Sequence, residues 1–197
     1  EFNASVFYYD WKQMISFQPL FDPALGIAIP QLLNVPEASL LGADVDVQWA
    51  PGDGWLVKLS LGLLDGQIDD PGLIANVSAG NKLPNVPKTS FTGVVRKEMQ
   101  MGDGTASAQV NWRYQGFLTY DLAGARQLSQ PAYWILNARA AYAFGSDEQY
   151  EVSVWGKNLT GTEYCNTRTS LEGLTDALVC IPFLGEPTFG VSALYSF

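Results

Sequence analysis

The stretch Leu41-Gly42-Ala43-Asp44-Val45-Asp46-Val47-Gln48-Trp49 decides the fold. Every odd position in it is apolar, and every even position is small or polar. Because successive side chains of a β-strand point to opposite sides, this run predicts a strand with one apolar and one polar face. Trp55–Leu63 repeats the alternation with a less polar second face, and Ala106–Tyr114 repeats it fully.

Five weaker alternating runs bring the expected number of strands to eight: Phe2–Trp11, Thr89–Met99, Tyr133–Phe144, Tyr150–Lys157 and Thr188–Phe197. Three of the connections are tight and have the Gly, Pro and Asp residues of hairpin turns: Pro51–Gly54, Met101–Gly104 and Gly145–Glu148. Four are long, about Lys12–Glu37, Asp65–Lys88, Asp121–Pro131 and Gly161–Glu186. The short connections all fall at one end of the expected sheet and the long connections at the other. We therefore expect an all-β, antiparallel up-and-down meander.

Composition narrows the possible functions. The 197 residues include 11 Lys and Arg against 20 Asp and Glu, a net charge of −9 that argues against a nucleic-acid partner. The absence of histidine excludes histidine-dependent triads and His-ligated zinc. Asp44 and Asp46 have a spacing that could serve acid–base catalysis, but a polar row along a strand explains them better. We expect no enzyme activity, catalytic residue, cofactor or metal site.

The apolar face has aromatic residues toward the strand ends, with aliphatic and small residues between: Trp49, Trp55, Trp112, Tyr114, Tyr142 and Tyr150. Two aromatic girdles around an apolar band are what a transmembrane β-barrel presents to lipid. The polar face would then line the lumen, because a basic residue at the bilayer midplane costs about 2–4 kcal/mol. The ionised side chains assigned to the lumen are Asp44, Asp46, Arg113 and Arg139. A soluble β-sandwich or lipocalin-like barrel is the alternative.

The only two cysteines, Cys165 and Cys180, lie in the last long loop. In an oxidising compartment a disulfide is the simplest interpretation of such a pair. Two free thiols are the alternative, and a metal site is less favoured because two thiolates leave the coordination incomplete.

The C-terminal third is similar to a known family. Val152–Tyr164, with Lys157-Asn158-Leu159-Thr160 at its centre, resembles the penultimate strand of TonB-dependent outer-membrane receptors. Gly185–Phe197 resembles their final strand with its terminal aromatic residue. Earlier segments match in the family's order: Phe7–Trp11, Gly42–Pro51, Leu83–Lys88 and Tyr133–Tyr142. The resemblance covers nearly the whole chain and depends on the order and spacing of loose motifs.

The resemblance implies a barrel of 22 strands with a plugged lumen, in the bacterial outer membrane. Residues 1–197 would be its C-terminal segment, without the plug domain and TonB box. The implied partners are outer-membrane lipid and lipopolysaccharide, the plug and earlier strands, TonB through the N-terminal part, and a small-molecule nutrient. The final strand implies a barrel-assembly signal made of Phe189, Val191, Tyr195 and Phe197.

The function that follows is uptake of a scarce nutrient: an iron chelate (siderophore uptake), cobalamin or an oligosaccharide. Aromatic candidates for ligand contact in the loops are Trp11, Phe17, Phe21, Tyr120, Tyr164 and Phe183. The long loops hold ten acidic and five basic residues, which disfavours purely electrostatic capture of an anionic chelate. The alternatives are a self-closed eight-stranded anchor barrel and a soluble β-rich binding protein.

Overall fold

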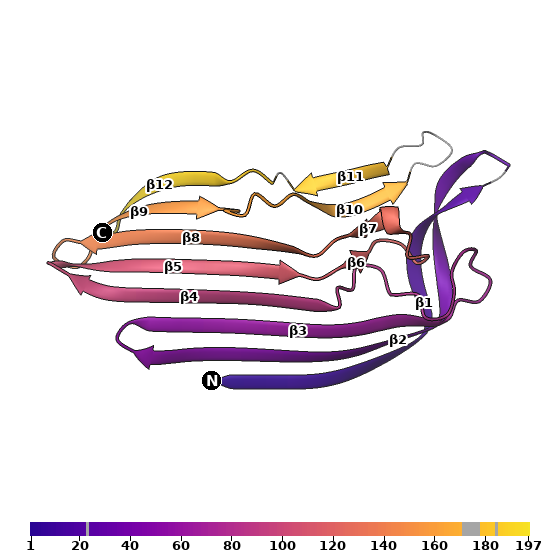
Figure 1. Ribbon diagram of the computed structural model, residues 1–197, viewed down its shortest axis with the longest axis horizontal. Helices are drawn as coiled ribbons and strands as arrows, with labels where there is room; N and C mark the ends of the chain where they lie inside the picture. The colour runs from indigo at the N-terminus through magenta and orange to yellow at the C-terminus, as the bar shows by residue number, and fades with distance from the viewer. Residues whose placement is uncertain (23, 171–177, 184) are drawn as a thin grey trace.

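The expected meander forms a single antiparallel sheet. The computed structural model describes residues 1–22, 24–170, 178–183 and 185–197. In the described part the sheet contains eight strands in chain order (Figure 1): β1 (Phe2–Asp22), β2 (Ile27–Gly52), β3 (Trp55–Asp70), β4 (Thr89–Met101), β5 (Gly104–Gln115), β8 (Tyr133–Phe144), β9 (Tyr150–Lys157) and β12 (Thr188–Tyr195). All eight predicted strands are confirmed, and the tight turns all lie at one end. We call the two ends of the sheet the turn end and the loop end.

The long connections contain structure of their own. One holds β6 (Leu118–Thr119), a 3-10 turn (Arg126–Leu128) and β7 (Ser129–Gln130), and another holds the hairpin of β10 (Tyr164–Ser170) and β11 (Leu178–Phe183). Within the described residues no helix is long and apolar enough to cross a bilayer.

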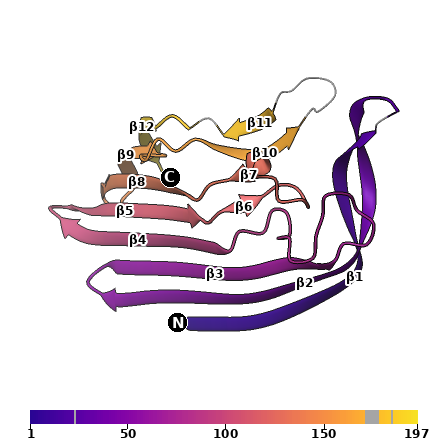
Figure 2. The same cartoon turned by 45° about the vertical axis from the view of Figure 1, so that its right-hand side comes forward.

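The prediction of a loop over Lys12–Glu37 was wrong, because β1 and β2 continue through it as a paired hairpin. The prolines of this segment do not indicate a strand, since proline lacks the N–H that the interior of a sheet requires. Here Pro19 lies opposite Pro30, in a two-stranded extension where each strand has one unpaired side and a missing donor is tolerated. Figure 2 shows this extension turned away from the direction of the other strands.

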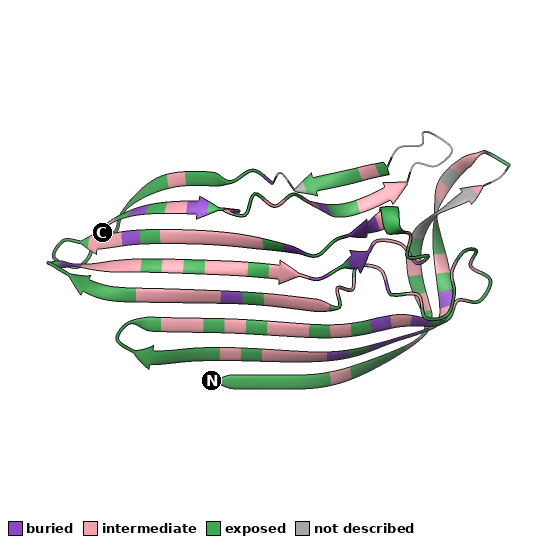
Figure 3. Ribbon diagram, in the orientation of Figure 1, coloured by how far each residue is buried: buried purple, intermediate pink, exposed green. Residues whose placement is uncertain are grey.

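The sheet is open and one layer thick. Its edges are β1 and β12, which do not pair with each other, so the described strands do not form a self-closed eight-stranded barrel. No second layer of described residues covers the apolar face either: Val110, Val154 and Val191 are all exposed. A soluble protein would bury this face in a core. The buried residues instead gather toward the loop end (Figure 3).

The register separates the two faces across the whole sheet. One row aligns Asp46 with Ser60, Ser60 with Thr92 and Thr92 with Arg113. The next row, on the opposite face, runs through Val47, Leu59, Gly93, Trp112 and Leu136. Asp44 and Arg139 have the same parity as the first row, so the four ionised residues predicted to face the lumen share one face. We call it the polar face.

Aromatic rings gather at both ends of the apolar face. Toward the loop end the ring of Trp134 lies 4.8 Å from that of Tyr114 and 6.4 Å from that of Phe91. At the turn end, rings follow one another at 5.2–5.8 Å through Tyr142, Phe144, Tyr150 and Tyr195. Trp134 and Tyr142 are separated by about 27 Å along β8 at ~3.4 Å per residue, or roughly 20 Å along the normal of a barrel with strands tilted by ~40°. This spacing is close to the height of an apolar band in lipid.

We expect neighbouring positions of β3 to report opposite environments. A nitroxide spin label attached through Leu61→Cys should be relaxed mainly by dioxygen, because dioxygen concentrates in lipid. The label attached through Ser60→Cys should be relaxed less by dioxygen and more by a water-soluble nickel chelate. The measurement is power-saturation electron paramagnetic resonance on the full-length protein in lipid vesicles. The same preference at both positions would contradict the two-faced arrangement.

Candidate functional site

A small apolar core lies on the polar face at the loop end, in a region that the sequence analysis assigned largely to long loops. Its buried residues are Val35, Ala38, Leu40, Ile68, Leu83 and Leu122. The loop between β3 and β4 folds back over the sheet, and Leu83 packs onto Gly66. A Cβ added at Gly66 would lie 3.0 Å from Cδ1 of Leu83 and 3.4 Å from Cδ1 of Leu40. Because this glycine has no side chain, the loop can lie close against the sheet.

Two long loops are joined to each other as well as to the wall. The side-chain amide of Asn81 donates to the carbonyl of Leu122 at 2.9 Å, and the backbone N–H of Asn85 donates to the carbonyl of Thr119 at 2.8 Å. Leu122 contributes to the apolar core from the second loop. The connections β3–β4 and β5–β8 thus form one packed body at the loop end.

The middle of the polar face is a shallow, open concavity of about 520 Å³, lined in part by Lys58, Ser60, Asn111, Arg113 and Asn137. The four ionised residues predicted to face the lumen do not pair with one another among the described residues. Instead, Arg139 pairs with Glu151 at 2.6 Å and Asp46 accepts a hydrogen bond from Ser60 at 2.5 Å. No group of His, Cys, Asp and Glu residues suited to a metal ion occurs within the described ranges.

Nearer the loop end, residues of β5, β8 and β10 and of the β3–β4 and β5–β8 connections line an open cleft of about 330 Å³. Its lining includes Arg113, Gln115, Tyr120, Tyr133 and Tyr164. The rings of Tyr133 and Tyr164 stack with centroids 4.5 Å apart and planes 11° from parallel. Gln115 accepts hydrogen bonds through Oε1 from Arg113 at 2.6 Å and from the Tyr133 hydroxyl at 3.3 Å. We refer to this region as the tyrosine cleft.

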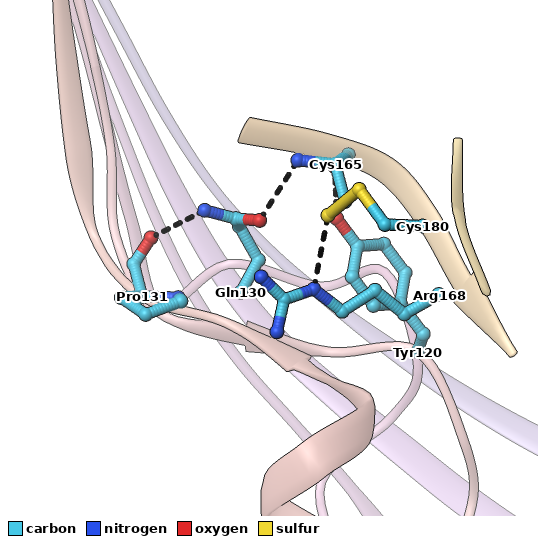
Figure 4. Close-up of a disulfide and its surroundings, with 6 residues drawn as sticks. All are labelled: Tyr120, Gln130, Pro131, Cys165, Arg168 and Cys180. Atoms are coloured by element: carbon cyan, nitrogen blue, oxygen red, sulfur yellow. Dashed lines mark hydrogen bonds between the residues drawn. A yellow bond between two sulfur atoms is a disulfide. The ribbon is translucent and has the colours of Figure 1, made fainter. Parts of the chain in front are cut away.

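The predicted disulfide is confirmed between Cys165 and Cys180, and Figure 4 shows its surroundings. Gln130 accepts the backbone N–H of Cys165 at 3.0 Å, and the Tyr120 hydroxyl donates to the Cys165 carbonyl. Burial raises the pKa of Tyr120 above its usual value, which lies well above neutral pH already, so the hydroxyl is protonated and can donate. Cys165 is therefore fixed to the β5–β8 connection as well as to its own hairpin.

The candidates for ligand contact are not brought together at one place. Tyr120 and Tyr164 line the tyrosine cleft, whereas Trp11 packs against the apolar core and Phe17 is exposed on the β1–β2 extension. The side chains of Phe21 and Phe183 lie outside the described residues. Sequence reasoning missed Tyr133 and Gln115. Their positions just inside β8 and β5, on the polar parity near the loops, were the available signal.

Three of the four assembly-signal residues lie on the apolar face of β12, and Phe197 follows the strand. Phe189, Val191 and Tyr195 pair with the apolar-face residues Gly156, Val154 and Tyr150 of β9, and all three are exposed, as is Phe197. The prediction that they form a recognition strand stays a prediction.

The Lys157-Asn158-Leu159-Thr160 motif forms a buried polar junction where β9 ends. Asn158 has φ +50°, a conformation that asparagine tolerates well. Its side-chain amide donates to the carbonyls of Thr162 at 3.1 Å and Gly185 at 2.6 Å, and its Oδ1 accepts the N–H of Thr162 at 3.1 Å. Its own N–H donates to Asn137 Oδ1 at 2.8 Å. Asn158 thereby fixes both ends of the last long connection to the wall.

Comparisons with known proteins agree with this geometry. The family model described as "TonB dependent receptor-like, beta-barrel" matches residues 1–159. The solved ferric yersiniabactin uptake receptor FyuA from Yersinia pestis superposes with a TM-score of 0.77 at 19% identity, covering 100% of this chain and 27% of that one. The siderophore receptor PiuA from Acinetobacter baumannii gives 0.68 at 17%, covering 98% and 26%. The chain thus spans about a quarter of the length of these structures, and at such identities the likeness concerns the fold.

We expect Asn158→Ala to destabilise the barrel by about 3 kcal/mol, because each buried polar group left without a partner costs about 1–3 kcal/mol. The measurement is the urea unfolding midpoint of the full-length protein in lipid vesicles, followed by tryptophan fluorescence. Thr160→Ala, which removes an exposed hydroxyl from the same junction, is the matched control and should cost less than about 1 kcal/mol. Equal effects of the two substitutions would argue against the junction.

Replacing both cysteines by serine should loosen the β10–β11 hairpin without unfolding the barrel. A cross-link that closes a loop of about 15 residues contributes about 3 kcal/mol by restricting the unfolded segment. Limited proteolysis should therefore cut between Cys165 and Cys180 faster in the double variant. Reductant should produce the same change in the wild type and none in the variant. Unchanged cleavage would show that the docking of Cys165 suffices.

Proposed function

Because this chain belongs to the family of TonB-dependent receptor β-barrels, we propose that it forms part of an outer-membrane receptor that imports a scarce small-molecule nutrient with TonB. Family membership is the observation that carries the proposal. In it, residues 1–197 are the C-terminal part of the barrel wall, and the plug, the earlier strands and the TonB box belong to the rest of the receptor. No catalytic role is part of the proposal.

The two faces of the sheet support a position in the outer membrane. The apolar face, with aromatic rings at both ends, suits lipid and the lipopolysaccharide leaflet. The polar face, with Asp44, Asp46, Arg113 and Arg139, then faces the lumen and the plug. The long connections lie outside the cell and the tight turns in the periplasm, as is usual for these barrels.

The loop end supports capture of a ligand from outside the cell. The tyrosine cleft opens there on the lumen side of the wall, beside loops that are packed against it. An iron chelate is the first candidate for the nutrient, because one similar structure is described as a ferric yersiniabactin uptake receptor and another as a siderophore receptor. Cobalamin and oligosaccharides are the other candidates.

Deleting the gene for the full-length receptor should abolish uptake of one nutrient. A panel of radiolabelled ferric chelates, cobalamin and oligosaccharides would be supplied to wild-type, deleted and complemented cells. We expect one member of the panel to lose uptake on deletion and regain it on complementation. A protonophore should block the restored uptake, because TonB-dependent import uses the energised inner membrane. Unchanged uptake of every member after deletion would contradict the proposal.

A further inference from the structure

The disulfide of the β10–β11 hairpin joins two sulfur atoms in unlike surroundings. Cys165 is buried, with 6% of its surface exposed, whereas Cys180 is an exposed residue of β11. The main chain of Cys165 is also held in place, because its N–H donates to Gln130 and its carbonyl accepts from the Tyr120 hydroxyl. A thiolate in solution therefore reaches the sulfur of Cys180 more readily, and access helps to decide which sulfur of a disulfide is attacked.

A guanidinium group lies beside the buried sulfur. Nε of Arg168 donates to Sγ of Cys165 at 3.1 Å (Figure 4). Both residues belong to β10, and Arg168 lies directly opposite Cys180 in the register of the hairpin. Within the described part of the chain Arg168 forms no ion pair with a carboxylate. Its positive charge can therefore stabilise a negative charge on the sulfur of Cys165.

These two differences between the sulfur atoms act in the same direction during thiol–disulfide exchange. In this reaction one sulfur bonds to the incoming thiol, and the other sulfur leaves as a thiolate. A sulfur whose thiolate is stabilised leaves faster, and a neighbouring arginine stabilises a thiolate. Exposure thus favours Cys180 as the attacked sulfur, and the contact with Arg168 favours Cys165 as the leaving sulfur.

We propose that this disulfide is a site of modification by small thiols with a fixed direction, in which Cys180 receives the thiol and Cys165 is released. The thiol first loses its proton to water. Its thiolate attacks Sγ of Cys180, and a new S–S bond forms there as the bond between the two cysteines breaks. The electron pair of the broken bond moves to Sγ of Cys165, which becomes a thiolate beside Arg168. One disulfide is consumed and one is formed, so the thiol is the only co-reactant.

The exchange opens the covalent closure of the hairpin and leaves its other attachments in place. Cys165 keeps its main-chain hydrogen bonds to Gln130 and Tyr120, and β10 and β11 remain paired as strands. The added group is carried on the exposed strand β11, away from the main sheet. The loop end can therefore carry a covalent modification whichever nutrient the receptor imports.

Exchange with glutathione on the purified full-length receptor in detergent tests the direction. Samples are quenched with acid at short times, free thiols are labelled with N-ethylmaleimide, and the labelled peptides are identified by mass spectrometry. We expect glutathione on Cys180 and maleimide on Cys165, about tenfold more abundant than the reverse pattern because access and the leaving group act together. Equal amounts of the two patterns, glutathione mainly on Cys165, or glutathione on neither cysteine at any time would overturn the proposal.

Substitution of Arg168 tests its role in the exchange. Arg168→Gln should slow the release of the Cys165 thiol about threefold or more, because the thiolate loses a charged donor. Arg168→Lys keeps the charge and should slow the release less. The matched control is Arg126→Gln, which removes the same charge from an exposed residue of the β5–β8 connection and should change neither the rate nor the modified residue.

Heat-modifiable migration on a gel checks that each variant is folded. Equal slowing in Arg168→Gln and Arg126→Gln, or faster release in Arg168→Gln, would contradict the role of Arg168. The pattern of labels on the wild type decides the direction of exchange even if Arg168→Gln does not fold.

Discussion

The antiparallel hydrogen-bond ladder is the constraint on which the rest of the structure depends. It satisfies the backbone of each inner strand from both sides, so a sheet only one layer thick can stand in an environment without water. The ladder also sends alternate side chains to opposite faces, so the adjacent residues Leu61 and Ser60 lie on opposite sides of the sheet. A slip of one residue would exchange the faces, so the pattern of side chains also fixes the register.

This constraint ends where the strands leave the sheet, and other interactions take over at the loop end. A small core around Leu83 and Leu122 packs two connections against the wall, and buried polar groups such as Asn158 hold the third. The apolar core lies on the face that is polar elsewhere. The two-faced rule therefore describes the middle of the strands, while the loop end folds more like a soluble domain, with its own interior.

The parts of the structure that could be predicted are those encoded locally. Alternation such as that around Val45 identified all eight strands, and two cysteines in one connection identified the disulfide. The β1–β2 extension was missed because its prolines are tolerated only where a strand has an unpaired side, which sequence does not reveal. The tyrosine cleft depends on Tyr133 meeting Tyr164 from different strands, and the ion pairs at the loop end depend on which lysines find carboxylates. Both depend on contacts between residues that are far apart in the sequence, and composition does not reveal such contacts.

The position of Tyr164 shows how a side chain of the candidate site can be fixed on a connection between strands of the main sheet. Two residues earlier, Thr162 donates to the Trp134 carbonyl at 2.6 Å and is bonded to Asn158. The next residue, Cys165, is hydrogen-bonded to Gln130 and Tyr120 and forms the disulfide with Cys180. With its neighbours held on both sides, the ring of Tyr164 is placed by the wall and the adjacent loop. Substitutions farther along the hairpin can therefore alter the rim of the cleft while its stacked tyrosines stay in position.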